Sequence, residues 1–586
     1  MSLVCPVSAN EEKGGFDPKN MEKFMKMLPG NKNGSDSSSS FMNMFKDKFI
    51  NKNDDDKTDK VTEKRSKHHE HVKQKSYLLT PNTSSATTTT NACTKPAIVG
   101  RPLVQFVVVV DAGSTGSRVH IVKFNNCAKT PQAENEDYYK IEPGLSSYAA
   151  DNNLQAAAES IRPLLMAAMK AVPPELHSST PIAVKATAGL RLLPSSTSQH
   201  ILDAVRAEIA QSTKFQIVKK DGVSIMSGDM EGVYSWWTVN MLLGNVPGYF
   251  NATNNNDGTS ASVPEIGQGG KRSFTATTLE MGGASTQLTF KPDSTLNVPS
   301  KYIHQLKTEN GQTHGLYMHS YLGYGQVEAR NKAFRHIASQ SKSQGGTGVV
   351  SSSCFGPGFA SNTAPPTTSD SVTRNKSGSQ SPRLPVTIVG RTNEAGRSSF
   401  DRCYQEIKPI LNLNKPCFLN SSDSANNDIT TKSCSFDGQF QPGLQQAHPN
   451  RIYMLSKFYD TLYPFIYPQT TLTIEYIKSV GQALCSSVGG SSSNDTKGMD
   501  EDKGLKQKLQ SRKLKGPKNS VDKKMNKGLE KQLSNPYLCL DIVYLTALLL
   551  DGFKVDPKYE LSMAETINGF RTGWVLGAAM DIVTTM

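Results

Sequence analysis

The sequence predicts an α/β protein made of two similar halves with a cleft between them. Residues 107–124 read VVVVDAGSTGSRVHIVKF, and residues 277–290 read TTLEMGGASTQLTF. In both, an apolar or β-branched strand ends in an acidic residue, a turn rich in glycine and hydroxyl groups follows, and a second alternating strand leads away. Elsewhere, strand patterns alternate with segments of helical spacing, which is typical of α/β domains.

The ordered part of the first half is expected to begin near Pro102. Its strands are expected at 104–110, 119–124, 182–187 and 215–217, and its helices at 153–171 and 198–212. Pro173 and Pro174 end the first helix, because proline cannot continue one. Ser198 is expected to cap the start of the second.

The second half starts around Gly228 and repeats this scheme. A helix rich in aromatic residues is expected over 232–242, followed by a hairpin over 274–290. Further helices are expected at 325–340, 453–463, 474–486 and 538–550. The chain ends in segment 569–586, where Gly-Trp-Val-Leu-Gly opens an apolar helix.

Length and composition indicate two domains with disordered additions. A chain of 586 residues is too long for one core, and its hydrophobic content of 36% is low for a globular protein. Residues 1–95 are rich in Lys, Asp, Asn and Ser and are expected to form a disordered tail. Polar inserts near 343–385 and 487–535 have a similar composition.

The net charge of +13 raises the possibility of nucleic-acid binding, but most of it lies in one run. Residues 503–531 contain eleven Lys and Arg against Asp522 and Glu530. Aromatic residues are not interleaved there, so we expect a solvated surface insert and no nucleic-acid partner. A patch for an acidic partner or a membrane surface is the alternative.

The cysteines favour an oxidising compartment. Six of the nine lie in the second half without CxxC spacing, which argues against zinc and for up to three disulfides. These six are Cys354, Cys403, Cys417, Cys434, Cys485 and Cys539. Cys5, Cys93 and Cys127 are scattered. The sequence shows no signal peptide at Met1 and no apolar run near 18 residues. Three alternatives follow: a wrong start of the gene model, an unconventional secretory route, or a cytosolic protein with reduced thiols.

Four short blocks are expected to converge on the cleft, at 111–118, 185–191, 228–232 and 280–287. Glycine lets the backbone approach a ligand closely and turn its N–H groups toward an anion. The carboxylate at the strand end is well placed to hold a divalent cation beside that anion. Two such turns facing each other would bind one polyphosphate from both sides.

These four blocks resemble the apyrase conserved regions of the GDA1/CD39 nucleoside phosphatase family. Residues 321–325 (YLGYG), 434–442 (CSFDGQFQP) and 573–577 (GWVLG) resemble further signatures of that family. The resemblance covers roughly residues 100–586 apart from the inserts. It is greatest to the fungal Golgi guanosine-diphosphatase type.

The resemblance implies two ribonuclease-H-like domains, related to actin and Hsp70, with the active site in the cleft between them. We assign residues 96–227 with 565–586 to domain I and residues 228–564 to domain II. It also implies a nucleoside di- or triphosphate substrate and Mg²⁺ or Ca²⁺ as cofactor. Membrane attachment is expected from the family, although the sequence shows no transmembrane segment.

The activity implied is hydrolysis of the terminal phosphate of GDP or UDP by direct attack of water, in support of glycosylation in the Golgi or secretory lumen. A broad-specificity nucleoside triphosphate diphosphohydrolase (apyrase) and a non-hydrolysing nucleotide-binding protein are the alternatives. An actin-like sugar kinase is a third, but nothing in the sequence marks a sugar site. A nucleophilic serine is not supported, because no G-x-S-x-G is present.

The resemblance also assigns roles within the four blocks. Glu231 matches the catalytic glutamate of the family and is expected to be the general base. Ser285 and Gln287 are expected to orient the same water. Asp111 and Glu280 are expected to bind the metal through its waters, because Mg²⁺ gives up its hydration shell reluctantly.

The phosphate oxygens are expected to be held by backbone N–H groups and hydroxyls of the two turns. These residues are Gly113, Ser114, Thr115, Gly116, Ser117, Arg118, Gly282, Gly283, Ala284, Ser285 and Thr286. Arg191 is expected to bridge phosphate, or else to pair with a surface acid. Thr187 is expected to touch a metal-bound water, or else to be a plain strand residue. Tyr459 is the nearest match for an aromatic stacked on the base, although an aromatic in an amphipathic helix is more often core.

One residue departs from the family pattern, which usually has Asp where Glu280 stands. The extra methylene moves the carboxylate by about 1.5 Å, and a displacement of about 1 Å can cost about 10²-fold in rate. Because a water-mediated role lets the metal shift, we expect activity to survive with an altered metal preference.

Overall fold

The computed structural model describes residues 93–149, 153–246, 248–249, 275–293, 298–340, 348–356, 358–363, 386–391, 399–417, 434–444, 451–487 and 520–586. The chain divides into two units, Met1–Glu70 and His71–Met586. All the described residues belong to the second unit. Apart from residues 93–95, the predicted disordered tail lies outside the described residues.

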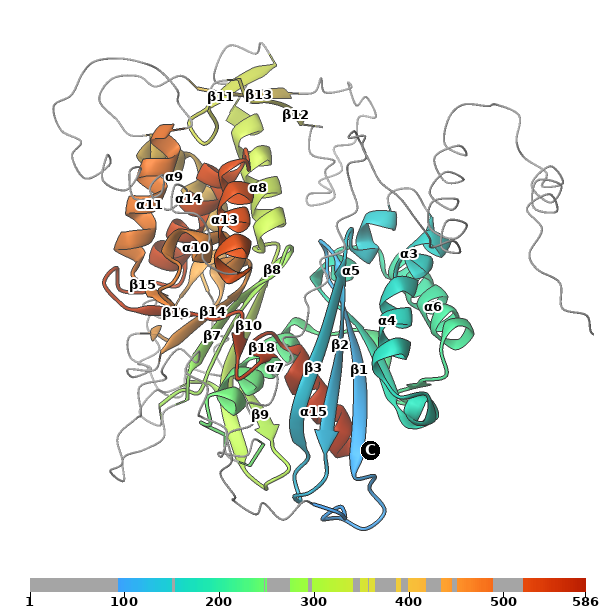
Figure 1. The fold of residues 1–586 in the computed structure, drawn as a ribbon. Coiled ribbons are helices and arrows are strands. Elements are labelled where there is room, and N and C mark those ends of the chain that lie inside the picture. Colours follow the sequence, from blue (N-terminus) through green and yellow to red (C-terminus); the bar gives the residue numbers. More distant parts are fainter. Residues whose placement is uncertain are drawn as a thin grey trace, which may run out of the picture. The chain divides into compact units, whose positions relative to one another are not determined.

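The first sheet contains the predicted first hairpin. Its strands are β1 (Val104–Ala112), β2 (Ser117–Asn125), β3 (Gln132–Ile141), β4 (Pro181–Ala186), β5 (Gln216–Ile217) and β6 (Val223–Ile225). The strand order is β3-β2-β1-β4-β5, with β6 also paired to β4. Figure 1 shows β3, β2 and β1 side by side. β1 and β2 are antiparallel, whereas β4 runs parallel to β1. The central strand β1 is fully buried from Val107 to Val110, which explains its unbroken apolar run.

The helices beside this sheet differ in detail from the prediction. They are α3 (Leu154–Ser160), α4 (Arg162–Ala171), α5 (Ala188–Arg191) and α6 (Ser195–Ser212). The helix expected over 153–171 is interrupted at Ile161, two residues before Pro163 in the first turn of α4. The prediction that Ser198 caps α6 is wrong. The helix begins after Pro194, and Ser198 is buried and donates its hydroxyl to Leu190 O at 2.9 Å.

The second sheet repeats the arrangement of the first. Its strands are β7 (Thr277–Met281), β8 (Ser285–Phe290), β9 (Ile303–Lys307), β10 (Thr313–Leu322), β14 (Ile452–Ser456), β15 (Thr471–Leu472) and β16 (Leu561–Met563). The order is β15-β16-β14-β7-β8-β10-β9. β7 and β8 form an antiparallel hairpin, and β14 runs parallel to β7 as β4 does to β1. The predicted duplication is therefore confirmed.

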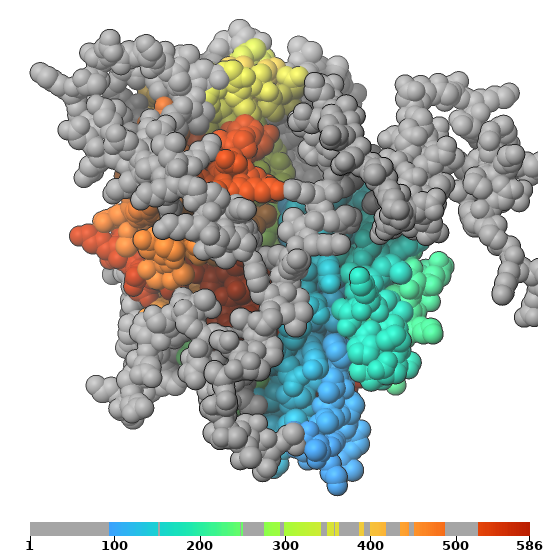
Figure 2. All heavy atoms as spheres, viewed as in Figure 1, coloured from blue at the N-terminus to red at the C-terminus, as the bar shows by residue number. Residues whose placement is uncertain are grey.

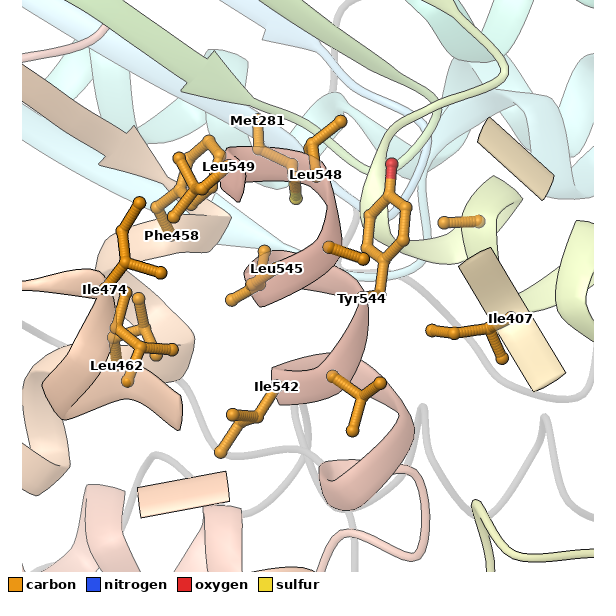
Figure 3. Close-up of a cluster of buried hydrophobic side chains, with 14 of the residues drawn as sticks. Met281, Ile407, Phe458, Leu462, Ile474, Ile542, Tyr544, Leu545, Leu548 and Leu549 are labelled. Carbon is orange, nitrogen blue, oxygen red and sulfur yellow. The ribbon is translucent and has the colours of Figure 1, made fainter. Parts of the chain in front are cut away.

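The remaining helices are α7 (Gly228–Leu242), α8 (Gln326–Ser339), α9 (Ser399–Ile407), α10 (Lys457–Ile466), α11 (Ile474–Ser487), α13 (Ser520–Leu533), α14 (Leu538–Ala547) and α15 (Val575–Thr585). The helix expected over 453–463 begins only at Lys457, because the apolar run before it pairs with β7 as strand β14. Figure 3 shows α14 inside a hydrophobic cluster, with Leu545 among side chains from several elements. A helix that is apolar on all sides has to be covered in this way.

The two polar inserts are partly structured, so the prediction of disorder is wrong for part of each. β11 (Val349–Ser352), β12 (Ala360–Thr363) and β13 (Val386–Gly390) form a three-stranded sheet. Figure 2 shows this sheet, in yellow, at the surface of the face drawn. In α13, Leu529 is buried and Gln532 Nε2 donates to Asp460 O at 2.8 Å. Residues 503–519 of the basic run lie outside the described residues.

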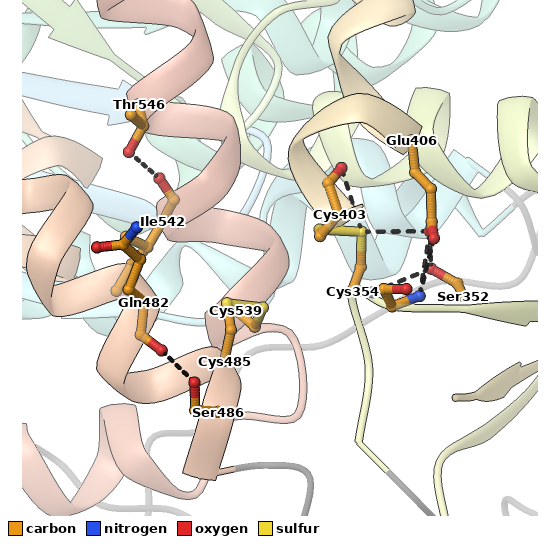
Figure 4. The surroundings of a disulfide bond; sticks show 11 residues. Ser352, Cys354, Cys403, Glu406, Gln482, Cys485, Ser486, Cys539, Ile542 and Thr546 are labelled. Atoms are coloured by element: carbon orange, nitrogen blue, oxygen red, sulfur yellow. Dashed lines mark hydrogen bonds between the residues drawn. A yellow bond between two sulfur atoms is a disulfide. The ribbon is translucent and has the colours of Figure 1, made fainter. Parts of the chain in front are cut away.

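Four disulfides join described cysteines. Three of them pair the six cysteines of the second half, as predicted in number: Cys354–Cys403, Cys417–Cys434 and Cys485–Cys539. Figure 4 shows the last of these between α11 and α14. The fourth, Cys93–Cys127, was not predicted, because the sequence analysis considered only the six cysteines of the second half.

The C-terminal segment returns to the first sheet. After β16 come the short strands β17 (Thr566–Ile567) and β18 (Phe570–Arg571), and then α15. Helix α15 shares a hydrophobic cluster with β1 and α7. Tyr234 of α7 donates its hydroxyl to Asp581 at 2.8 Å, and Thr238 accepts from the backbone N–H of Gly577 at 2.8 Å.

A search of the described residues finds no single helix that is long and apolar enough to cross a membrane. Within the part of the chain that the structure describes, one bent pair, Met525–Leu533 and Leu538–Gly552, meets the criteria of length and composition when taken together, with a bend of 97°.

Candidate active site

The two glycine-rich turns close in the same way. In the first, Gly113 N–H donates to Gly116 O at 3.1 Å, and in the second, Gly282 N–H donates to Ser285 O at 2.9 Å. Each bond forms a tight turn immediately after the acidic end of a strand. The similar sequences of the two hairpins therefore form turns with the same backbone hydrogen bond.

The tips of these turns touch each other. A Cβ atom added to Gly283 would lie 2.3 Å from Ser114 Oγ and 2.8 Å from Thr115 Cγ2. A Cβ added to Gly189, at the start of α5, would lie 2.8 Å from Ser114 Cα. Side chains at these glycines would push the blocks apart, so glycine is what allows three of the four blocks to meet.

Asp111 is paired with Arg118 across the first hairpin. The two residues are cross-strand partners, and Arg118 Nη1 donates to Asp111 Oδ2 at 3.1 Å. The same nitrogen lies 3.4 Å from Gly116 O. Arg118, which the sequence assigns to phosphate, is thus directed at the carboxylate that the sequence assigns to the metal.

Glu231 lies in the first turn of α7, a helix whose start is capped by Ser227. Its side chain is buried, with a relative exposure of 6% for the residue. Burial raises the pKa of Glu231 to about 8, despite the attraction of the Arg191 guanidinium beside it. Such a pKa near neutrality is what proton transfer at physiological pH needs.

A polar network surrounds this carboxylate. Arg191 Nη2 donates to Glu231 Oε2, and Gln287 Nε2 donates to the same oxygen at 3.1 Å. Gln287 Nε2 also lies 2.7 Å from Ser285 Oγ. The three residues assigned to water activation are therefore in one hydrogen-bonded group, and Arg191 pairs with a buried acid and not with a surface one.

Glu280, the last acidic residue of β7, is held by two serine hydroxyls. Ser235 of α7 donates to its Oε2, and Ser456 donates to its Oε1 at 2.9 Å. Ser456 has φ 58° at the junction of β14 and α10, a conformation that non-glycine residues rarely adopt. Burial raises the pKa of Glu280 to about 7, although these hydroxyl bonds oppose the rise.

The donor set fits a hydrated divalent cation. The charges of Asp111 and Glu280 contribute to the raised pKa of Glu231, and Asp111 contributes to that of Glu280. Three carboxylates that repel one another make a place where a cation is favoured, and oxygen ligands suit Mg²⁺ and Ca²⁺. Among the described residues, no three His, Cys, Asp or Glu side chains are grouped closely enough to hold a metal directly. Water-mediated contacts therefore fit the geometry better than a protein cage.

Thr187 joins the second block to the first hairpin through its backbone. Its N–H donates to Ala112 O at 3.2 Å, and the residue is 6% exposed at the start of α5. Three other assigned residues have their side chains engaged elsewhere or enclosed. Thr286 donates its hydroxyl to Tyr324 O at 2.8 Å, and the hydroxyl of Ser117 is buried without a protein partner. Tyr459 stacks on a neighbouring tyrosine of α10 with ring centroids 4.4 Å apart.

Sequence reasoning missed three serines of the site: Ser235, Ser320 and Ser456. Serine is common on helices and strands, so its position carries little information without the fold. Ser235 lies one helical turn after Glu231, and this i, i+4 spacing was the one available indication that it faces the same side.

The class of fold is shown by comparison with solved structures. A crystal structure of nucleoside triphosphate hydrolases from Neospora caninum matches with a TM-score of 0.51 and 15% sequence identity, covering 82% of this chain and 93% of that chain. The chain therefore shares the α/β fold of that structure. The two hairpins are corresponding parts of its two similar sheets.

The chain belongs to the GDA1/CD39 (nucleoside phosphatase) family, whose sequence model matches residues 101–586. It is 32% identical to the guanosine-diphosphatase of Candida albicans over 504 residues, covering 82% of this chain and 71% of that protein. It is 32% identical to the guanosine-diphosphatase of Schizosaccharomyces pombe over 493 residues, covering 83% of this chain and 74% of that protein. The apyrase of Solanum tuberosum is 29% identical to this chain over 502 residues, covering 82% of this chain and 88% of that protein.

Proposed function

We propose that this protein is a nucleoside diphosphatase that hydrolyses the outermost phosphate of GDP or UDP by direct attack of water. The observation that carries the proposal is the buried Glu231, with Gln287 bonded to its carboxylate, in a chain whose two glycine-rich hairpin tips meet. Guanosine-diphosphatases of similar sequence support the choice of a diphosphate substrate.

Glu231 takes a proton from the attacking water, which Ser285 and Gln287 orient. Arg191 holds the Glu231 carboxylate in place and adds positive charge next to the reacting phosphoryl group. Phosphoryl transfer needs positioning and charge neutralisation more than covalent help from the protein. The backbone N–H groups of the two turns supply further positive dipoles toward the phosphate oxygens.

The cofactor we propose is Mg²⁺ or Ca²⁺, held through water by Asp111 and Glu280. When bound, the cation neutralises phosphate charge and so assists departure of the nucleoside monophosphate. The contribution of Ser235 and Ser456 is to fix the Glu280 carboxylate from two sides. Arg118 does the same for Asp111 across the first hairpin.

The domain division and the cellular location are part of the proposal. Residues 96–227 with 565–586 form domain I, supported by the packing of α15 against β1, and residues 228–564 form domain II. Four disulfides support an oxidising compartment, the lumen of the secretory pathway. There the enzyme would clear the nucleoside diphosphates that glycosyltransferases release, as expected for a Golgi enzyme of this family.

The direct test is a substrate panel on the purified full-length chain, with phosphate release measured for GDP, UDP, ADP and GTP in Mg²⁺, Ca²⁺ or EDTA. We expect release from GDP and UDP that EDTA abolishes. GTP hydrolysed as fast as GDP would favour the broad-specificity apyrase instead, a function suggested by the similarity to the potato apyrase. Binding of nucleotide without phosphate release would leave the non-hydrolysing alternative.

A further inference from the structure

Ser320 lies on β10, opposite Gln287 of β8 in the antiparallel register. Its hydroxyl oxygen accepts a hydrogen bond from Gln287 Nε2 at 3.0 Å and one from Arg191 Nη1 at 3.4 Å. A serine hydroxyl has two acceptor lone pairs and one proton to donate. The Gln287 amide nitrogen and the Arg191 guanidinium nitrogen cannot accept a proton, so the Ser320 hydroxyl proton is committed to neither of them.

The same two donors also bind Glu231. Arg191 Nη2 donates to Glu231 Oε2, and Arg191 Nη1 donates to Ser320 Oγ. Gln287 Nε2 carries two protons and has three acceptors within reach, Ser285 Oγ, Ser320 Oγ and Glu231 Oε2. The Ser320 hydroxyl and the Glu231 carboxylate therefore lie within hydrogen-bond reach of the same guanidinium and the same amide group. Ser320 thus belongs to the polar network that surrounds the carboxylate of Glu231.

The position of Ser320 is fixed by the first turn of α7. A Cβ atom added to Gly228 would lie 2.2 Å from Ser320 Oγ and 2.4 Å from Arg191 Nη1. The serine is therefore pressed against the start of the helix that carries Glu231. A donor fixed by the protein before substrate binds costs little reorganisation during the reaction, which is the condition for strong electrostatic stabilisation.

We propose that Ser320 is a further catalytic residue, which donates its hydroxyl proton in a hydrogen bond to an oxygen of the outermost phosphoryl group. The inference rests on the proposed function of the same site. A donor aimed at the attacking water would withdraw electron density from the nucleophile, so a phosphoryl oxygen is the acceptor that fits. Because Arg191 and Gln287 face the Ser320 oxygen as donors, the Ser320 proton points away from both of them, toward the substrate.

The test is Ser320→Ala in the full-length protein, with Thr313→Ala as the matched control at the exposed start of the same strand. We expect kcat for GDP to fall by about 10²–10³-fold, as for the loss of one preorganised donor. Affinity for α,β-methylene-GDP, which binds without being hydrolysed, should stay within about threefold of wild type, because the bond strengthens in the transition state. Thr313→Ala should match wild type in both measurements.

The failures of the two ideas can be told apart. A wild-type protein that releases no phosphate from any nucleotide would refute the proposed function itself. An active wild type with Ser320→Ala within about threefold in kcat would overturn only the role of Ser320. Equal losses in kcat/KM and in analogue affinity would also overturn it, because they indicate a structural or ground-state role.

A second variant covers the case in which Ser320→Ala does not fold. Ser320→Cys keeps nearly the same shape, but its S–H is a weak donor. We expect kcat to fall by at least about tenfold, with the melting temperature near that of wild type. Wild-type turnover in Ser320→Cys would overturn the proposal.

Discussion

A buried carboxylate is costly to ionise, and Glu231 has to be ionised to act as a base. Burial raises its pKa to about 8, and the pKa of Glu280 rises to about 7 for the same reason. A divalent cation beside two such acids favours their charged forms and lowers both pKa values. At the scale of single residues, the proposed cation and the proposed general base therefore depend on each other.

The first prediction concerns the turnover of Glu231→Gln. The amide keeps the size of the side chain but cannot take a proton, so kcat for GDP should fall by about 10²–10⁴-fold. Glu175→Gln, at an exposed position, is the control and should keep full activity. Hydrolysis of GDP by purified Glu231→Gln at the wild-type rate would show that another group is the base.

The second prediction uses the same variant to test the raised pKa. Between pH 4.5 and about 8 the folded protein holds the Glu231 proton more tightly than the unfolded chain does. The free energy of unfolding of the wild type should therefore decrease as pH rises through this range, by at most about 1.4 kcal/mol per pH unit from this group. In Glu231→Gln this contribution to the pH dependence is absent, because the glutamine side chain does not titrate.

In EDTA, the melting temperature of Glu231→Gln should hence exceed that of the wild type by an amount that grows from pH 5 to pH 8. Thermal unfolding monitored by circular dichroism at several pH values measures this difference. A difference that does not change with pH would mean that the pKa of Glu231 is close to its ordinary value.

The third prediction concerns the residue that departs from the family pattern. The carboxylate of Glu280 bonds with both Ser235 and Ser456, and aspartate would withdraw it by about 1.5 Å from these hydroxyls. Glu280→Asp should therefore remain active but with a changed ratio of rates in Mg²⁺ and Ca²⁺. Glu175→Asp should leave that ratio unchanged, and identical profiles for Glu280→Asp and wild type would exclude metal tuning.

At the scale of elements, the hairpins could be predicted because each is a local pattern: a strand, an acid, a glycine turn and a second strand. Helix 453–463 could not, because the apolar run before Lys457 fits a helix or a strand equally well until its partner β7 is known. The same reason explains the order found within the inserts. α13 is stabilised by contacts with α10, and its composition alone indicates a solvated segment.

The fourth prediction tests the contact between the two hairpins. Gly283→Ala places a Cβ atom where Ser114 Oγ and Thr115 Cγ2 now lie, so the tips have to separate. Kinetics with GDP should show kcat/KM lower by about 10²-fold, the loss expected for a displacement of about 1 Å. Gly528→Ala is the matched control, since a Cβ there would find its nearest neighbour at 3.7 Å. Equal kinetics for Gly283→Ala and wild type would mean that the tips need not meet.

At the scale of the whole molecule, the sequence indicated the duplication and the four blocks but not the small residues that bring them together. Ser320 and Ser456 act across elements that are far apart in sequence, so neither has a local signature. What could be predicted was the chemistry carried by continuous segments.

The most direct measurement is a crystal structure of the full-length protein with Mg²⁺ and α,β-methylene-GDP. The account predicts that the outermost phosphoryl group touches both glycine-rich turns. It also predicts a water molecule between Glu231 and the phosphorus, opposite the bridging methylene group. An analogue bound against one turn alone, or with its outer phosphorus out of reach of Glu231, would contradict it.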